Sequence, residues 1–271
     1  MKNESAYTKK FAALLKKVKE AHQPAEPAST DPVTQLVVAY LQWNSSRKLA
    51  TAAHEKLMKQ MVDNNDLRVS HPHEIVNIIG EDYPRAHERA ARMLEALQEI
   101  FVREHVVSID GILAQGKKQA KAYLESLPGM VSYVSARVML LSAGAHVIPV
   151  DDLLRDKLVA EEVVDPDATI EEVAAFIERQ IKAGEALATH LALEEWSTVG
   201  GVRRTAPKPA PAAKPAAPAA KAVEARPAPA AKPAEAKAAK PAAKKTETKS
   251  NAKPAPKTTK KTTKKSTKSR R

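Results

Sequence analysis

The sequence predicts an all-α protein whose helical part is followed by a long basic tail. Apolar residues in the first two hundred positions recur at the three- and four-residue spacing of helices. The same positions show no convincing strand alternation and contain few aromatic residues. Near residue 200 the composition changes abruptly to lysine, alanine and proline. We therefore expect nine or ten helices, no sheet, and a boundary near residue 199.

The two parts carry opposite charge. The 271-residue chain has a formal net charge of +12, and residues 201–271 hold 21 Lys and Arg against three Glu, a net charge of +18. Residues 1–200 therefore carry a net charge of −6. This distribution indicates an acidic folded part joined to a segment that binds polyanions.

Cysteine is absent, which excludes disulfides, thiolate zinc sites and cysteine-ligated iron–sulfur clusters. His71 and His73 lack a partner cluster and start a helix, so we expect no metal and no cofactor. The lysine-rich N-terminus has no signal-peptide core, and no apolar stretch reaches membrane-spanning length. We expect a cytoplasmic, nucleoid-associated protein without a membrane partner.

The first long helix after the N-terminal one begins at Asp31-Pro32, an N-cap followed by proline at the first helical position. A second helix is expected over about 47–62, and a short one over 72–79 that Gly80 ends. Pro84 is expected to start the next helix. Its buried stripe consists of Ala86, Ala90, Met93, Leu94, Leu97, Ile100 and Phe101.

The remaining helices follow recognisable end signals. One covers about 117–126, and another resumes just after Pro128-Gly129. Asp151 precedes a further helix as its N-cap. The pattern Thr169-x-x-Glu172 is a capping box that opens a helix over 170–183, which we expect Gly184 to end. A last helix runs to about Trp196.

The break in "LESLPGMVSYVSARVML", residues 124–140, has a chemical use. Two short helices joined by a proline-glycine turn direct the N–H groups of the second helix outward, where they can bind a phosphate. The residues of this candidate DNA contact are Leu127, Pro128, Gly129, Met130, Val131 and Ser132. An ordinary corner between two helices is the alternative that the motif alone leaves open.

This segment, followed by "IPVDDLLRDKL", resembles the helix-hairpin-helix of DNA glycosylases related to endonuclease III. "DPVTQLVVAYLQWNSSRKLATAAHEKL" and "IIGEDYPRAHERAARMLEAL" resemble the family's preceding helices, in the same order. The resemblance covers roughly residues 10–198. It implies a six-helix lobe over about 31–146, a second lobe from 1–22 plus 147–199, and DNA lying across the cleft between them.

The resemblance also implies roles for single residues. Asp151 falls at the family's catalytic aspartate, a carboxylate that activates water or stabilises a cationic sugar. Asn44 corresponds to the polar residue that fills the gap left by a flipped base. Beside it, we expect Trp43 to complete the core. Asp151 has an equally sound structural role as an N-cap, and Asn44 as part of a turn.

Other positions depart from the family. Its bifunctional members carry a nucleophilic lysine just after the hairpin, where this chain has Tyr133-Val134, and no lysine lies between Lys121 and Lys157. We therefore expect no lyase activity on abasic sites. The usual second glycine of the hairpin is replaced in Gly129-Met130-Val131-Ser132, which makes the turn bulkier.

The tail, residues 200–271, has prolines every few residues and no large apolar side chains, so we expect it to be disordered. Its composition resembles that of linker-histone tails. Its spaced lysines suit the phosphates of double-stranded DNA and cannot read bases, so binding should be nonspecific and steeply salt-dependent. A solubilising linker is the alternative.

Two functions remain open from the sequence. The first is a base-excision-repair protein, a monofunctional DNA N-glycosylase that uses Asp151. The second is a non-catalytic DNA-binding or nucleoid-associated protein that retains the fold. The missing lysine, the altered hairpin and the acidic folded part favour the second, whereas the ordered resemblance and Asp151 favour the first. A weaker third idea is a scaffold whose tail binds RNA or acidic partners.

Overall fold

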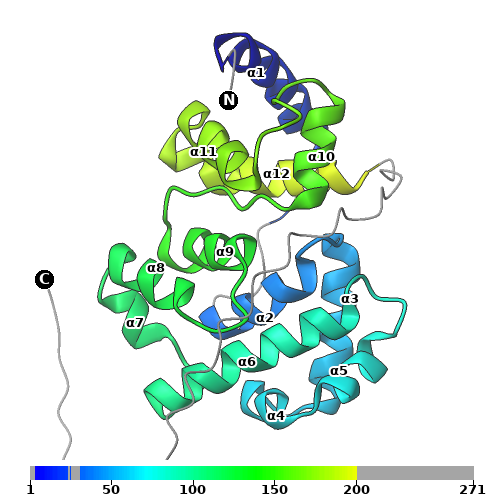
Figure 1. Ribbon diagram of the computed structural model, residues 1–271, viewed down its shortest axis with the longest axis vertical. Coiled ribbons are helices and arrows are strands. Elements are labelled where there is room, and N and C mark those ends of the chain that lie inside the picture. The colour runs from blue at the N-terminus through cyan, green and yellow to red at the C-terminus, as the bar shows by residue number, and fades with distance from the viewer. Residues whose placement is uncertain (1–3, 24, 26–30, 200–271) are drawn as a thin grey trace, which may run out of the picture. The chain divides into compact units, whose positions relative to one another are not determined.

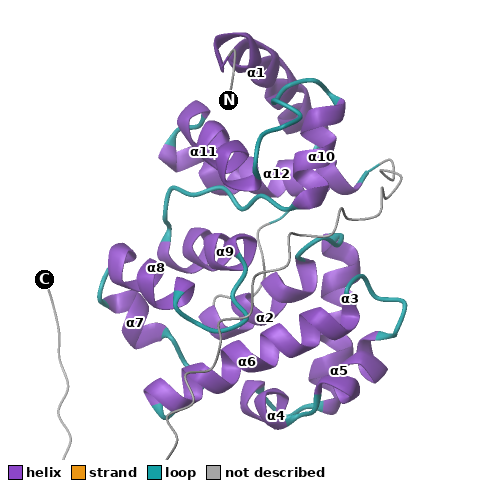
Figure 2. Cartoon of the chain, viewed as in Figure 1, coloured by secondary structure: helices purple, strands orange, loops and turns teal. Residues whose placement is uncertain are grey.

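A computed structural model describes residues 4–23, 25 and 31–199, so the predicted tail lies outside the described residues. Every element in this part of the chain is a helix (Figure 2). In order these are α1 Glu4–Ala21, α2 Pro32–Gln42, α3 Arg47–Gln60, α4 Asn64–Val69, α5 Pro72–Ile79, α6 Ala86–Glu104, α7 Asp110–Ala114, α8 Lys117–Glu125, α9 Ser132–Ala143, α10 Asp152–Ala160, α11 Ile170–Gln180, the short 3-10 helix η1 Ala183–Glu185, and α12 Ala186–Thr198.

The all-α prediction is confirmed. The Asp31 side chain accepts a hydrogen bond from the Thr34 N–H, and Thr169 and Glu172 form the expected capping box. Within the described residues, no helix is long and apolar enough to cross a membrane.

Two helix boundaries differ from the prediction. α6 begins at Ala86 instead of Pro84. Arg85 has a left-handed backbone with φ of 53°, so it cannot belong to the helix and is its N-cap instead. α11 ends at Gln180 rather than near Gly184, because Ile181 turns to an extended backbone and its side chain is buried. Gly184 lies inside η1.

The buried side chains form two clusters. The first gathers residues of α2, α3, α4, α5, α6, α8 and α9. It includes six of the seven residues expected in the buried stripe of α6, whereas the seventh, Phe101, is only partly buried. The second gathers α1, α10, α11 and α12, where Phe11 of α1 packs edge-on against Phe176 of α11. In Figure 1 these four helices lie at one end of the long axis, α2 to α6 lie toward the other end, and α9 lies between.

The hairpin between α8 and α9 is held against α6 and α2. A Cβ on Gly129 would lie 2.7 Å from the backbone oxygen of Arg92 and 2.8 Å from its Cα. Gly129 also has φ of +70°, and its carbonyl accepts a hydrogen bond from the Tyr40 hydroxyl at 3.2 Å. Glycine is therefore required here by packing as well as by the turn.

Replacing Gly129 by Ala should destabilise the protein by about 2–3 kcal/mol, because the new methyl group meets the α6 backbone at a strained φ. Urea unfolding followed by circular dichroism measures the loss. Gly144→Ala is the matched control, since Gly144 has φ of +56° but nothing within 4 Å of its Cβ position. It should lose only about 1 kcal/mol. Equal losses would mean that packing against α6 is unimportant.

Candidate functional site

Asp151 lies at the start of α10 and is buried, with only 6% of its surface exposed. Its Oδ1 accepts a hydrogen bond from the Leu154 N–H at 2.9 Å, as an N-cap does. Its Oδ2 accepts another from the Asn44 N–H, also at 2.9 Å. Each carboxylate oxygen thus already has a backbone donor, one from its own helix and one from the turn after α2.

Burial raises the pKa of Asp151 to about 6, although its two backbone hydrogen bonds act in the opposite direction. The carboxylates of Glu194 and Asp152 raise that pKa further. At pH 7 the group is therefore mainly ionised. Its geometry is that of a buried anion stabilised by backbone N–H groups.

Asn44 is brought directly against Asp151, but its side chain is directed at α10. The Nδ2 of Asn44 donates to Asp152 Oδ2 at 2.8 Å, and the Asp152 N–H donates to Asn44 Oδ1 at 3.0 Å. Asn44 is 8% exposed and has a left-handed backbone with φ of 55°. Both polar atoms of the amide are thus engaged within the protein.

The turn that carries Asn44 is fixed by Arg89 of α6. This fully buried guanidinium donates to the backbone carbonyls of Tyr40, Trp43 and Pro84. Two of these carbonyls lie at the end of α2, where helix carbonyls lack internal partners. Burial lowers the pKa of Arg89 to about 10, so it stays charged at neutral pH. Trp43 is buried, as expected, and completes the core beside Arg89.

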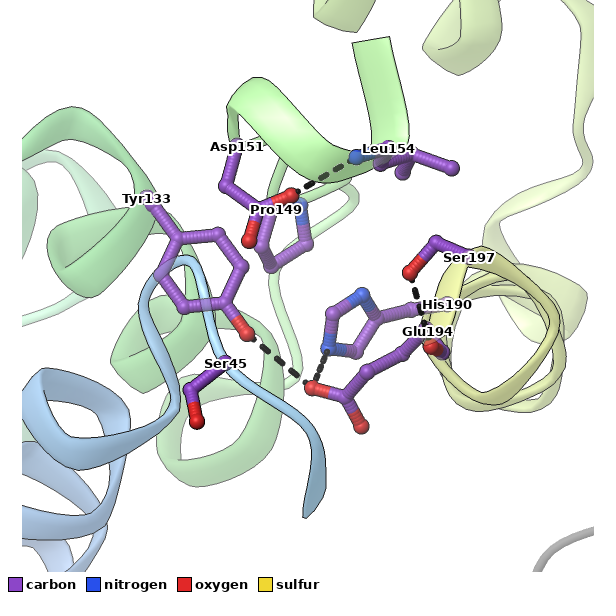
Figure 3. A pocket seen from close by; sticks show the side chains of 8 residues that line it. All are labelled: Ser45, Tyr133, Pro149, Asp151, Leu154, His190, Glu194 and Ser197. Carbon is purple, nitrogen blue, oxygen red and sulfur yellow. Dashed lines mark hydrogen bonds and ion pairs between the residues drawn. The ribbon is translucent and has the colours of Figure 1, made fainter. Parts of the chain in front are cut away.

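A small cavity adjoins Asp151 (Figure 3). Its volume is about 10 Å³, which is room for about one water molecule. A nucleobase is several times larger. The lining residues are Ser45, Tyr133, Pro149, Asp151, Leu154, His190, Glu194 and Ser197. In this structure the space beside Asp151 therefore admits no flipped base.

Glu194 of α12 lines this cavity and contacts residues of α3 and α9. Its Oε1 accepts a hydrogen bond from the Tyr133 hydroxyl at 3.0 Å and lies 3.5 Å from Arg137 Nε. Its Oε2 lies 3.0 Å from Arg47 Nη2. Figure 3 shows Tyr133 and His190 directed at the same carboxylate. Helices α3, α9 and α12 therefore meet at one buried anion.

Charge decides the protonation of this cluster. Burial alone would raise the pKa of Glu194, but His190 in its charged form, Arg137, Arg47 and the Tyr133 hydroxyl bring it to about 2. Burial lowers the pKa of His190 to about 4, so its imidazole is neutral at pH 7. The cations that stabilise Glu194 at neutral pH are therefore Arg137 and Arg47.

The hairpin residues lie partly on the surface. Pro128 and Ser132 are exposed, and Leu127 is buried in the first cluster. Gly129, Met130 and Val131 are half-buried. No side chain caps α9 at Val131, and its first turn holds no acidic residue. The N–H groups at the start of α9 thus remain candidates for a phosphate contact.

The position at which the family resemblance places a lysine, Tyr133-Val134, lies at the start of α9. Tyr133, the second residue of α9, lines the Asp151 cavity, and no lysine is among the lining residues. The next lysine along the chain, Lys157, donates to the backbone carbonyls of Trp196 and Val199 at the end of α12. It therefore serves to hold that helix end.

The sequence did not predict the roles of Glu194, His190, Arg47 and Arg137. One signal was available in α12, where His190 and Glu194 stand four residues apart in a mainly apolar stretch. Arg137 gave a similar signal, as a single charge within the apolar α9. Neither pattern indicates which distant helix supplies the partner.

No family model and no curated protein matches the chain. Solved structures do. A trapped endonuclease III–DNA covalent intermediate matches with a TM-score of 0.55 at 15% identity, over 69% of this chain and 84% of that one. A thermostable thymine-DNA glycosylase matches with a TM-score of 0.53 at 17% identity, over 74% and 90%. The H. pylori 3-methyladenine DNA glycosylase MagIII, bound to 1,N6-ethenoadenine, matches with 0.54 at 14%, over 68% and 95%.

At these identities the comparisons establish the fold. The described part of the chain has the all-α architecture of the helix-hairpin-helix DNA glycosylases, as the sequence resemblance implied. The roles of Asp151, Asn44 and the hairpin remain predictions.

Proposed function

We propose that this protein binds double-stranded DNA with a helix-hairpin-helix glycosylase-like fold and does not excise bases. One observation carries the proposal: both oxygens of Asp151 accept backbone hydrogen bonds beside a cavity of about 10 Å³. A glycosylase must take the target base out of the stack and into a pocket. Here Tyr133, His190 and Glu194 line the small space beside Asp151, which is too small for a base.

DNA binding is supported by three features. Several proteins of this fold have been solved with DNA, including the trapped endonuclease III intermediate. The uncapped start of α9 follows a turn in which Pro128 is exposed. Residues 201–271 carry a net charge of +18 in the sequence, which suits a phosphate backbone. We assign most of the affinity to this charge and the positioning on the duplex to the hairpin.

Monofunctional base excision by Asp151 is the second candidate, and one observation favours it. The buried carboxylate directly contacts Asn44, the residue that the family resemblance places at the flipped base. For this function the seam between α10 and the turn after α2 would have to open on DNA. Opening would break the paired hydrogen bonds between Asn44 and Asp152 and the Tyr133–Glu194 bond.

Under either function, the folded part should form no Schiff base with an abasic sugar. Tyr133-Val134 falls where the family resemblance places the nucleophilic lysine, and Lys157 is engaged at the end of α12. Incubating the protein with an abasic duplex and borohydride, followed by peptide mapping, should give no adduct within residues 124–160. Adducts on tail lysines are the internal control for reagent activity. An adduct mapped to residues 124–160 would contradict the assignment.

The proposal itself is tested by measuring binding and base release in the same samples. Saturating duplex binding without base release is the expected result. Release that depends on Asp151 would instead establish the second candidate. Absence of duplex binding by the full chain at low salt would contradict both.

A further inference from the structure

A second cavity lies between α8, α9, α11 and the connecting residues 147–150, of which Pro149 lines the Asp151 cavity. Its volume is about 280 Å³, large enough for a small organic molecule. Much of its lining is apolar, and the small alanine side chains on the α11 side leave room for a ligand. The apolar lining residues are Ala136, Met139, Val147, Ile148, Val150, Ile170, Ala174 and Ala175.

The charged lining of this cavity is mostly anionic, and its uncharged polar members are Ser132 and Ser135 of α9. Glu125, Glu171 and Glu178 line it, against the single cation Lys121, which lies 3.7 Å from Glu125. Glu178 Oε1 accepts a hydrogen bond from the Ile148 N–H at 3.0 Å, which fixes that carboxylate at the cavity wall. The surrounding segment, residues 147–199, has a net charge of −9. The field at the cavity therefore attracts cations.

The spacing of Glu171 and Glu178 along α11 sets the distance that a ligand with two charges must span. Glu171, Ala174, Ala175 and Glu178 follow one another at positions i, i+3, i+4 and i+7, so they share one helix face. Seven residues of helix place the Cα atoms of Glu171 and Glu178 about 10 Å apart along the helix axis, with only alanines between them on that face. The pattern suits a thin apolar chain with a positive charge at each end.

We propose that this cavity binds linear aliphatic diamines and polyamines. The methylene chain would lie over Ala174 and Ala175, and its terminal ammonium groups would pair with Glu171 and Glu178. Each buried methylene adds a few-fold to affinity, and each ammonium gains a charge-assisted hydrogen bond. Two lysine side chains of a peptide offer the same chemistry, so both sources are compared below.

Isothermal titration of the full chain with amines of increasing length tests the length requirement. Binding should saturate at one ligand per chain and be tighter for 1,8-diaminooctane and spermidine than for 1,4-diaminobutane. Octylamine, which keeps the chain but has one charge, should bind roughly tenfold more weakly than 1,8-diaminooctane. Equal affinity across the length series, or binding that does not saturate, would overturn the proposal.

Two variants locate the site. Glu171→Gln with Glu178→Gln should weaken 1,8-diaminooctane binding at least roughly tenfold. Ala175→Leu should abolish it without changing the charge, because leucine fills the space over the helix face. The control Glu55→Gln with Glu81→Gln removes two exposed carboxylates elsewhere and should leave the affinity unchanged. Circular dichroism verifies that each variant is folded.

Comparing these variants distinguishes binding at this cavity from nonspecific attraction of cations to the acidic surface. Weakening that is equal in the cavity and control pairs would overturn the proposal, as would unchanged binding by Ala175→Leu. A short peptide with two lysines provides the second source. If it binds more tightly than the diamines and loses binding in the same variants, the ligand is a peptide segment. If the diamines bind more tightly, it is a free polyamine.

Discussion

Deleting residues 203–271 is expected to weaken binding to random-sequence duplex DNA by at least ~100-fold at about 50 mM salt. The deletion removes nearly all of a segment with net charge +18 and leaves a part with net charge near −6. The shortened chain neutralises fewer phosphates and so releases fewer counterions, which should make the slope of log affinity against log salt markedly flatter. Fluorescence anisotropy of a labelled duplex at four salt concentrations measures both quantities.

Two control variants separate charge from length and order in this experiment. A full-length chain with the tail lysines and arginines replaced by glutamine should behave like the deletion. A chain with the same tail composition in scrambled order should bind like the wild type, because phosphate contacts carry no base sequence information. If the deletion binds as tightly as the full chain, with an unchanged salt slope, the affinity must reside in the folded part.

Replacing Glu194 by Gln is expected to destabilise the folded part by about 3 kcal/mol at pH 7. This figure is the usual cost of removing one partner of a buried ion pair, about 3–5 kcal/mol, because the remaining charges stay buried without compensation. The variant keeps the shape of the side chain but leaves Arg47 and Arg137 without their shared anion. Urea unfolding at fixed pH measures the difference.

The effect should depend on pH in a defined direction. Because the folded-state pKa is depressed, the stabilisation by Glu194 is complete above about pH 4.5 and is lost as the pH falls through 2. The difference between wild type and variant should therefore fall to less than half at pH 3. Glu195→Gln, a neighbour whose side chain is 46% exposed, is the control and should change stability little. A pH-independent difference would contradict the ionic account.

The fold was largely predictable because its helices carry local end signals. Asp31-Pro32, the Thr169 capping box and the Asp151 cap all act within one helical turn, so the residues themselves indicate the boundaries. The short helices α4 and α7, with six and five residues, were missed. Segments of this length contain too few apolar positions to show a helical period.

The site was predictable only in part. The family resemblance indicated Asp151 and Asn44 separately, and the structure brings them together. Which residues line the space beside Asp151 could not be predicted, because Tyr133 and Glu194 are 61 residues apart and their hydrogen bond depends on how α9 and α12 pack. Local propensity contains no information about such a pairing. Both residues line the small cavity beside Asp151.

Single-turnover base excision with wild type and Asp151→Asn tests the central claim most directly. Duplexes carrying uracil, mismatched thymine, 8-oxoguanine or 1,N6-ethenoadenine are saturated with protein, and released bases are quantified with binding measured in parallel. Asparagine can reproduce only one of the two hydrogen bonds to the Asp151 oxygens, so melting temperatures are measured alongside. The account predicts saturated binding by wild type with no release above the protein-free background. Base release by wild type that disappears in a folded, DNA-binding Asp151→Asn variant would contradict it and make Asp151 catalytic.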